Sequence, residues 1–155
     1  MKKFYSILFA LLLVCGVAFA ANIPGVVDPD DGGPEVWVTS VYNNSSTTLD
    51  VGDIVIWDVD ASTGDDDNWV TTTTTAGTHL AAGIVYPKDI AAGESGTIAI
   101  RGPVQVDVMG VVTDGKVCTS TEAAKATTCA GANDANSIGI ATSATSAGSA
   151  TVLLK

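Results

Sequence analysis

The sequence is poor in the residue types that most active sites need. It contains one histidine, His79, in 155 residues. One chain therefore cannot build a multi-histidine metal site, and a serine triad would depend on this residue alone. No glycine-rich loop ending in lysine is present to cradle a phosphate. We expect His79 to be a polar residue at the mouth of a strand, and the chain not to be an enzyme.

Basic residues are also scarce. Seven Lys and Arg stand against seventeen Asp and Glu, which gives a formal net charge of −10. A surface this acidic repels nucleic acid and anionic membranes, so neither is an expected partner. A solvated acidic surface is the simpler interpretation, and attraction of cations or basic proteins is the alternative.

Residues 1–20 lack the length to be a typical membrane anchor. Two lysines precede an apolar run (7–17) that ends shortly before Ala20, as in a secretory signal peptide cleaved after that alanine. The run is shorter than the roughly 20 residues needed to span a bilayer, which favours removal over a retained anchor. A lipoprotein leader built on Cys15 is less favoured, because Val14 stands where a small residue is usual. The sequence thus predicts export to the periplasm, the exterior or the cell surface, without membrane attachment after cleavage.

Phenylalanine is absent after Ala20, and the remaining apolar residues are mainly Val, Ile and Ala. β-Branched residues suit pleated sheets, whereas a helical bundle would be richer in leucine. The large aromatic side chains that remain include Trp37, Trp57 and Trp69. We expect these tryptophans to anchor the core, with an interface as the alternative.

The chain divides into three parts. Residues 1–20 form the leader, and residues 21–35 hold three prolines and three glycines, which predicts a flexible N-terminal arm. Residues 36–155 alternate apolar with polar residues between turn-forming segments, which predicts a single all-β domain, a small barrel or sandwich. Within it, the threonine run 71–75 is expected to continue a strand, and Gly102-Pro103 to be a tight turn between two strands. Helical turns are expected only at residues 89–92 and 122–126.

The domain contains an internal repeat, with units at about residues 51–100 and 113–154. Val51-Gly52-Asp53-Ile54-Val55 corresponds to Thr113-Asp114-Gly115-Lys116-Val117, and Gly83-Ile84-Val85 corresponds to Gly139-Ile140-Ala141. The spacing between these pieces is longer in the first unit, which places an acidic insertion at residues 61–67. A duplicated set of strands with glycine turns and no shared catalytic residue type predicts a structural scaffold.

Carboxylates cluster around that insertion and suggest a metal site, because hard cations prefer several oxygen ligands. The candidate ligands are Asp58, Asp60, Asp65, Asp66 and Asp67. The segment begins like a calcium loop but has Thr63 at its sixth position and Trp69 at its twelfth, where glycine and glutamate are expected. A secreted module that binds calcium or a glycan through residues 58–69 is therefore an alternative function. A hydrolase using Asp60 and Asp65 is a third hypothesis.

Two cysteines remain after the leader, Cys118 and Cys129, on strands that we expect to be neighbours. Outside the cytoplasm a disulfide between them is favoured, and closing a loop of this size stabilises a fold by on the order of 3 kcal/mol. Two small buried thiols are the alternative.

The glycine and alanine turns resemble those of a family of small phage structural proteins, the capsid decoration or head-fibre type. The resemblance is carried by residues 51–55, residues 90–98, Gly139-Ile140-Ala141 and residues 147–152, and spans about residues 49–154. It implies a compact β-barrel or sandwich that sits on a protein shell, often as a trimer, without catalysis. The secretory leader does not fit that family, whose members assemble in the cytoplasm. The sequence therefore predicts an exported, self-associating structural module, with the virion surface as the alternative location and no cofactor.

Overall fold

The computed structural model describes residues 35–59, 68–111, 113–146 and 148–155, and of residues 132–134 the backbone only. The predicted leader and all but the last residue of the predicted arm lie outside these ranges. In the described part of the chain, no helix has the length and apolar character needed to cross a bilayer.

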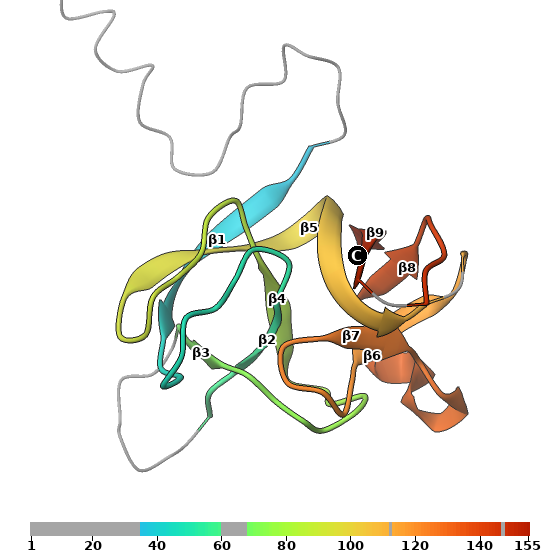
Figure 1. The fold of residues 1–155 in the computed structure, drawn as a ribbon, viewed down its shortest axis with the longest axis horizontal. Coiled ribbons are helices and arrows are strands. Elements are labelled where there is room, and N and C mark those ends of the chain that lie inside the picture. Colours follow the sequence, from blue (N-terminus) through green and yellow to red (C-terminus); the bar gives the residue numbers. More distant parts are fainter. Residues whose placement is uncertain (1–34, 60–67, 112, 147) are drawn as a thin grey trace, which may run out of the picture.

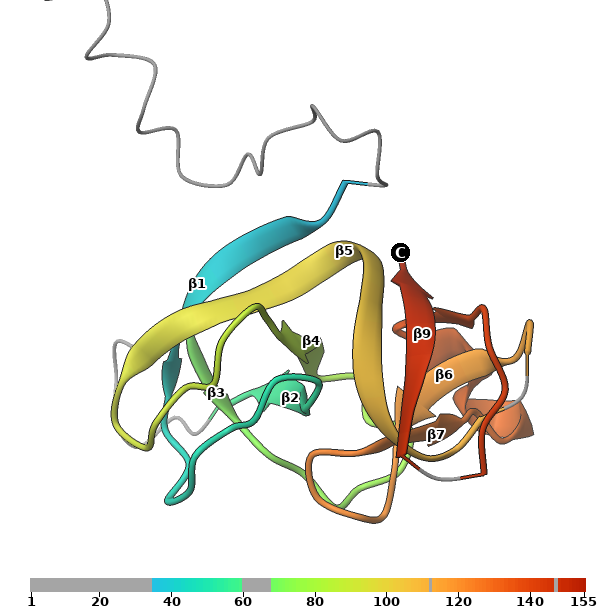
Figure 2. The same cartoon turned by 45° about the horizontal axis from the view of Figure 1, so that its top comes forward.

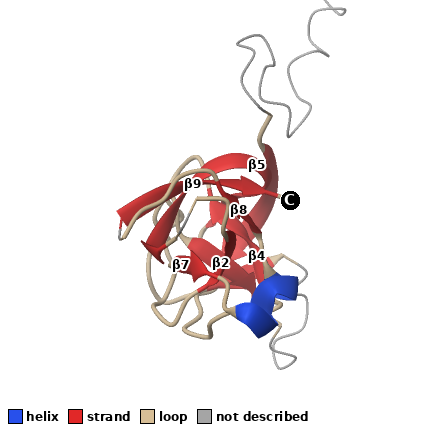
Figure 3. Cartoon of the chain, turned by 90° about the vertical axis from the view of Figure 1, so that its right-hand side faces the viewer, coloured by secondary structure: helices blue, strands red, loops and turns tan. Residues whose placement is uncertain are grey.

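The regular secondary structure of the described residues consists of β-strands and a single short helix, joined by loops (Figure 3). The strands are β1 (Trp37–Asn43), β2 (Ile54–Trp57), β3 (Trp69–Thr71), β4 (Ala81–Val85), β5 (Ser95–Gly110), β6 (Lys116–Thr119), β7 (Ala126–Thr128), β8 (Gly139–Ala141) and β9 (Gly148–Leu154). The helix is the 3-10 helix η2 (Gly131–Asn136). The predicted all-β class is confirmed.

The strands close into two small barrels that lie side by side (Figure 1). The first barrel runs β1–β3–β2–β4–β5 and closes because β5 pairs with β1. The second barrel runs β5–β7–β6–β8–β9 and closes because β9 pairs with β5. Closure leaves few free sheet edges in either unit.

Strand β5 belongs to both barrels, and it bends sharply where its colour passes from yellow to orange (Figure 2). Its residues up to Arg101 pair with β1, and those from Gly102 onward pair with β9. Gly102 has a φ of 99°, which an L side chain rarely adopts, so glycine allows the strand to change direction without ending. The predicted turn at Gly102-Pro103 is wrong, because the chain bends there within one continuous strand.

The two barrels share the same pattern of strand pairing. In each, the first strand is parallel to the third and every other pairing is antiparallel. The register also agrees, since Val55 pairs with Gly83 in the first barrel and Val117 pairs with Gly139 in the second. These are the positions that the sequence repeat places in correspondence.

Each barrel has an apolar interior, and part of the outer face of the first barrel packs on the second. The interior of the first barrel is Val41, Leu49, Val55, Val70, Val85, Ile90 and Ile98. Ile54, Ile84 and Ala99 alternate with these residues and therefore point outward, yet they are buried in the same cluster as the core of the second barrel. The barrels are thus joined by a hydrophobic interface as well as by β5.

Two local predictions differ from the structure. The threonine run leaves its strand after Thr71, and the Thr75 amide instead donates to the Thr73 hydroxyl at 3.0 Å, a local turn that competes with the ladder. The helical turn lies at Gly131–Asn136, not at residues 89–92 or 122–126.

Candidate functional site

Two of the three tryptophans pack in the first barrel. Trp57 is partly buried against the interior of the first barrel. Trp69 pairs with Tyr42 across parallel strands, and the two rings lie 5.2 Å apart at 34°. Such tilted aromatic pairs add to the stability that burial provides.

Trp37 is placed differently, because it is 47% exposed at the start of β1. The guanidinium carbon of Arg101 lies 5.2 Å from the centre of its ring, close enough for a cation–π contact. The expectation that Trp37 belongs to the core is wrong, since the described residues leave nearly half of its surface uncovered at the start of β1. The interface alternative remains a prediction for this residue.

Trp37 and Arg101 form one wall of an apolar groove of about 480 Å³. Its other wall is on the second barrel, where Ile140 of β8 and Leu153 of β9 are directly paired. Both are exposed, at 43% and 48%. Exposed aliphatic side chains grouped beside an aromatic ring and an arginine are typical of protein-binding surfaces.

A second hollow of about 390 Å³ adjoins this groove and shares Leu154 and Lys155 with it. It lies between the barrels, because residues of β4 in the first barrel and of η2 and β9 in the second line it. His79 lines it together with Asn136. Asn136 donates from Nδ2 to the Gly77 carbonyl at 2.7 Å, so it holds the two barrels together.

Most of the predicted metal ligands lie outside the described residues, namely Asp60, Asp65, Asp66 and Asp67. The remaining one, Asp58, accepts a hydrogen bond from Asn44 Nδ2 at 2.7 Å. Over the ranges that the structure describes, no three His, Cys, Asp or Glu side chains are grouped to hold a metal ion. The calcium, glycan and hydrolase hypotheses all depend on the undescribed loop and stay predictions.

The predicted disulfide is present. Cys118 in β6 bonds to Cys129 just after β7, with the Cα atoms 5.1 Å apart. It braces the base of the hairpin that joins these two strands, and the alternative of two free thiols is wrong.

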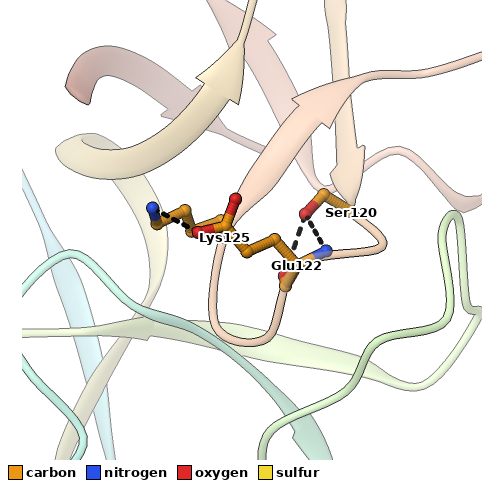
Figure 4. Close-up of polar contacts among 3 residues, drawn as sticks. All are labelled: Ser120, Glu122 and Lys125. Atoms are coloured by element: carbon orange, nitrogen blue, oxygen red, sulfur yellow. Dashed lines mark hydrogen bonds and ion pairs between the residues drawn. The ribbon is translucent and has the colours of Figure 1, made fainter. Parts of the chain in front are cut away.

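The tip of that hairpin is a compact turn (Figure 4). The Ser120 hydroxyl donates to the Glu122 carbonyl and accepts from the Glu122 amide, both at 2.9 Å. Lys125 pairs with the Glu122 carboxylate at 2.6 Å, and this contact raises the pKa of Lys125. Between them the carbonyl of Ala124 accepts a hydrogen bond from the Ile54 amide at 2.8 Å. The hairpin of the second barrel is therefore fastened to β2 of the first.

Carboxylates gather at the same junction, a feature that sequence reasoning missed. Asp53 is half-buried there, and burial raises its pKa to about 6, helped by the nearby charges of Asp50, Asp107 and Asp89. The Asp50 amide donates to Asp53 Oδ2 at 2.8 Å, which opposes part of the rise. Asp89 and Asp107 are far from Asp53 in sequence, so only the tertiary structure reveals the cluster.

Protonation of Asp53 should therefore stabilise the fold. Because its pKa is higher in the folded protein than the ordinary value of 3.8, the folded state binds this proton more tightly than the unfolded chain. The stabilisation is complete below about pH 4 and is lost as the pH rises through about 6. After a discount for solvent screening we expect a loss of about 1 kcal/mol.

Urea unfolding of the wild type and of Asp53→Asn, followed by tryptophan fluorescence across this range, measures the effect. The asparagine oxygen can still accept from the Asp50 amide but carries no charge. The stability of the wild type relative to the variant should fall as the pH rises. A difference that stays constant with pH would contradict the assignment.

No protein-family model matches the sequence, and comparison with curated proteins finds none that is similar to it. Comparison with solved structures does find similar folds. The head fiber gp8.5 N base of bacteriophage phi29 superposes with a TM-score of 0.54 over 76% of this chain and 94% of that chain.

The fold is similar to that of a phage head fiber base. The sequence identity is 15%, so the likeness is one of architecture. The predicted resemblance to head-fibre proteins is confirmed at this level.

Proposed function

We propose that the chain is a non-catalytic structural protein that attaches to a protein shell or surface and associates with copies of itself. The supporting observation is the likeness in architecture to the phi29 head fiber base, nearly all of which is covered. A head fiber is a component of a virus particle. The same likeness in architecture therefore supports a role for this chain on the surface of a virion.

The exposed groove supplies a means of attachment. Trp37, Ile140 and Leu153 present apolar surface to solvent, whereas the interiors of both barrels are filled by their own side chains. Aromatic, arginine and aliphatic side chains in one hollow provide the contact area and the polar anchor that protein interfaces use. The mechanism is burial of this surface against a partner.

The predicted leader extends the proposal to location. If residues 1–20 are removed on export, the same module acts outside the cytoplasm, on a cell surface or on particles that meet it there. Sequencing the N-terminus of the protein purified from its source tests this point separately, and a chain that begins at Ala21 supports export.

The structural role is tested by immunogold electron microscopy with antibodies against the purified protein. The proposal expects gold on a regular surface, that of virus particles or of the cell envelope. A Trp37→Asp variant should lose surface label while it keeps its melting temperature. A diffuse soluble pool of wild-type protein, with no labelled surface, would overturn the proposal.

A further inference from the structure

One outer face of the first barrel is covered by the second barrel. Ile84 of β4 and Ala99 of β5 are paired across the sheet and point away from the interior of the first barrel. Both have no exposed surface, because they belong to the apolar cluster of the second barrel. This face therefore needs a neighbouring barrel to bury it.

The corresponding face of the second barrel is left partly exposed by the residues that the structure describes. Ile140 follows Gly139 in β8 as Ile84 follows Gly83 in β4, and Ile140 pairs with Leu153 of β9 as Ile84 pairs with Ala99. Here the two side chains are 43% and 48% exposed. The leucine also presents more apolar surface than the alanine at the matching position.

We infer that this face of β8 and β9 binds a second copy of the chain, which covers Ile140 and Leu153 as the second barrel covers Ile84 and Ala99. The inference rests on the proposed function and deepens it, since it names the partner and the surface of self-association. The face of Ile84 and Ala99 is covered by a five-stranded barrel of this same chain. A barrel from another copy therefore has a suitable shape to cover Ile140 and Leu153.

Continuity supports the same partner. The groove continues into the hollow between the barrels through Leu154 and Lys155, so the new contact extends an interface that the chain already builds.

The contact joins unlike surfaces, because within one chain the outer face of one barrel meets a different part of the next. Repetition of such a contact between copies gives a closed ring or an open filament rather than a simple two-fold dimer. Both are architectures suited to decorating a shell.

The experiment compares the molar mass of full-length wild type, Leu153→Lys and Met109→Lys by sedimentation equilibrium at micromolar concentrations. Met109 is 42% exposed on β5 and does not line the groove, so it is a matched control. We expect the wild type and Met109→Lys to be multimers of the same mass. Leu153→Lys should dissociate at least about 30-fold more readily, which is typical for loss of an interface anchor.

Thermal melts of the three proteins separate a lost contact from a lost fold, and Ile140→Lys repeats the test from the neighbouring strand. A monomeric wild type, or a Leu153→Lys variant that assembles as well as the wild type, would overturn the inference. Surface label with a monomeric wild type would support the proposed attachment to a surface and overturn self-association through this face. Multimers of the wild type with no surface label would support self-association and overturn the proposed attachment.

Discussion

Gly102→Ala is expected to lower the free energy of unfolding by about 4 kcal/mol, because it combines backbone strain with a steric clash. The φ of 99° at this residue is costly for any L side chain. A Cβ atom built there also meets the Glu35 carbonyl oxygen and comes within 3.0 Å of the Val36 Cα. Both are backbone atoms, so no side-chain rotation relieves the contact.

Gly148→Ala is the control, since Gly148 has a φ of 100° but nothing within 4 Å of its added Cβ. It isolates the strain and should cost about 1–2 kcal/mol. Urea unfolding by fluorescence measures both. Equal losses would show that the segment before β1 moves freely away from the bend in β5.

Gly83→Ala and Gly139→Ala should each lower the free energy of unfolding by about 3 kcal/mol, and the two losses should be similar. A Cβ at Gly83 meets the Ala99 carbonyl oxygen, and one at Gly139 meets the Leu153 carbonyl oxygen. In a five-stranded barrel the strands approach so closely at these positions that only hydrogen fits. The agreement between the two sites follows from the matching register of the barrels.

Gly110→Ala serves as the comparison within a strand. Its added Cβ is 3.2 Å from the Ser146 carbonyl oxygen, a contact that a small shift removes, so about 1 kcal/mol is expected. Chemical denaturation of the three variants gives the values. A Gly139→Ala variant as stable as the wild type would refute the equivalence of the two glycines.

The fold class and several strands could be predicted because their signals are local. Val, Ile and Thr in alternation indicate strands, and Cys118 and Cys129 stand on two strands joined by a short hairpin, where neighbours along the chain are neighbours in space. The sequence repeat is also a local signal, and the pairings of Val55 with Gly83 and of Val117 with Gly139 occupy matching positions in it.

The candidate site was less predictable because its parts come from distant segments. In sequence, Trp37 and Trp57 are both large aromatic residues in expected strands. In the structure Trp37 is exposed at a groove, whereas Trp57 packs against a barrel interior. In sequence, Ile140 and Leu153 are apolar residues of ordinary strands. Their exposure follows from which barrel faces are covered, and no local pattern encodes that.

By itself the sequence determined an all-β chain with glycine turns between its strands and one disulfide, because backbone preference and hydrophobic alternation act over a few residues. Only the tertiary structure decided that Gly102 bends one strand to serve two barrels, that Asp53 lies near Asp107, and that the described residues leave one apolar face partly exposed. These outcomes depend on the docking of one closed barrel against another, which is set by contacts between residues far apart along the chain.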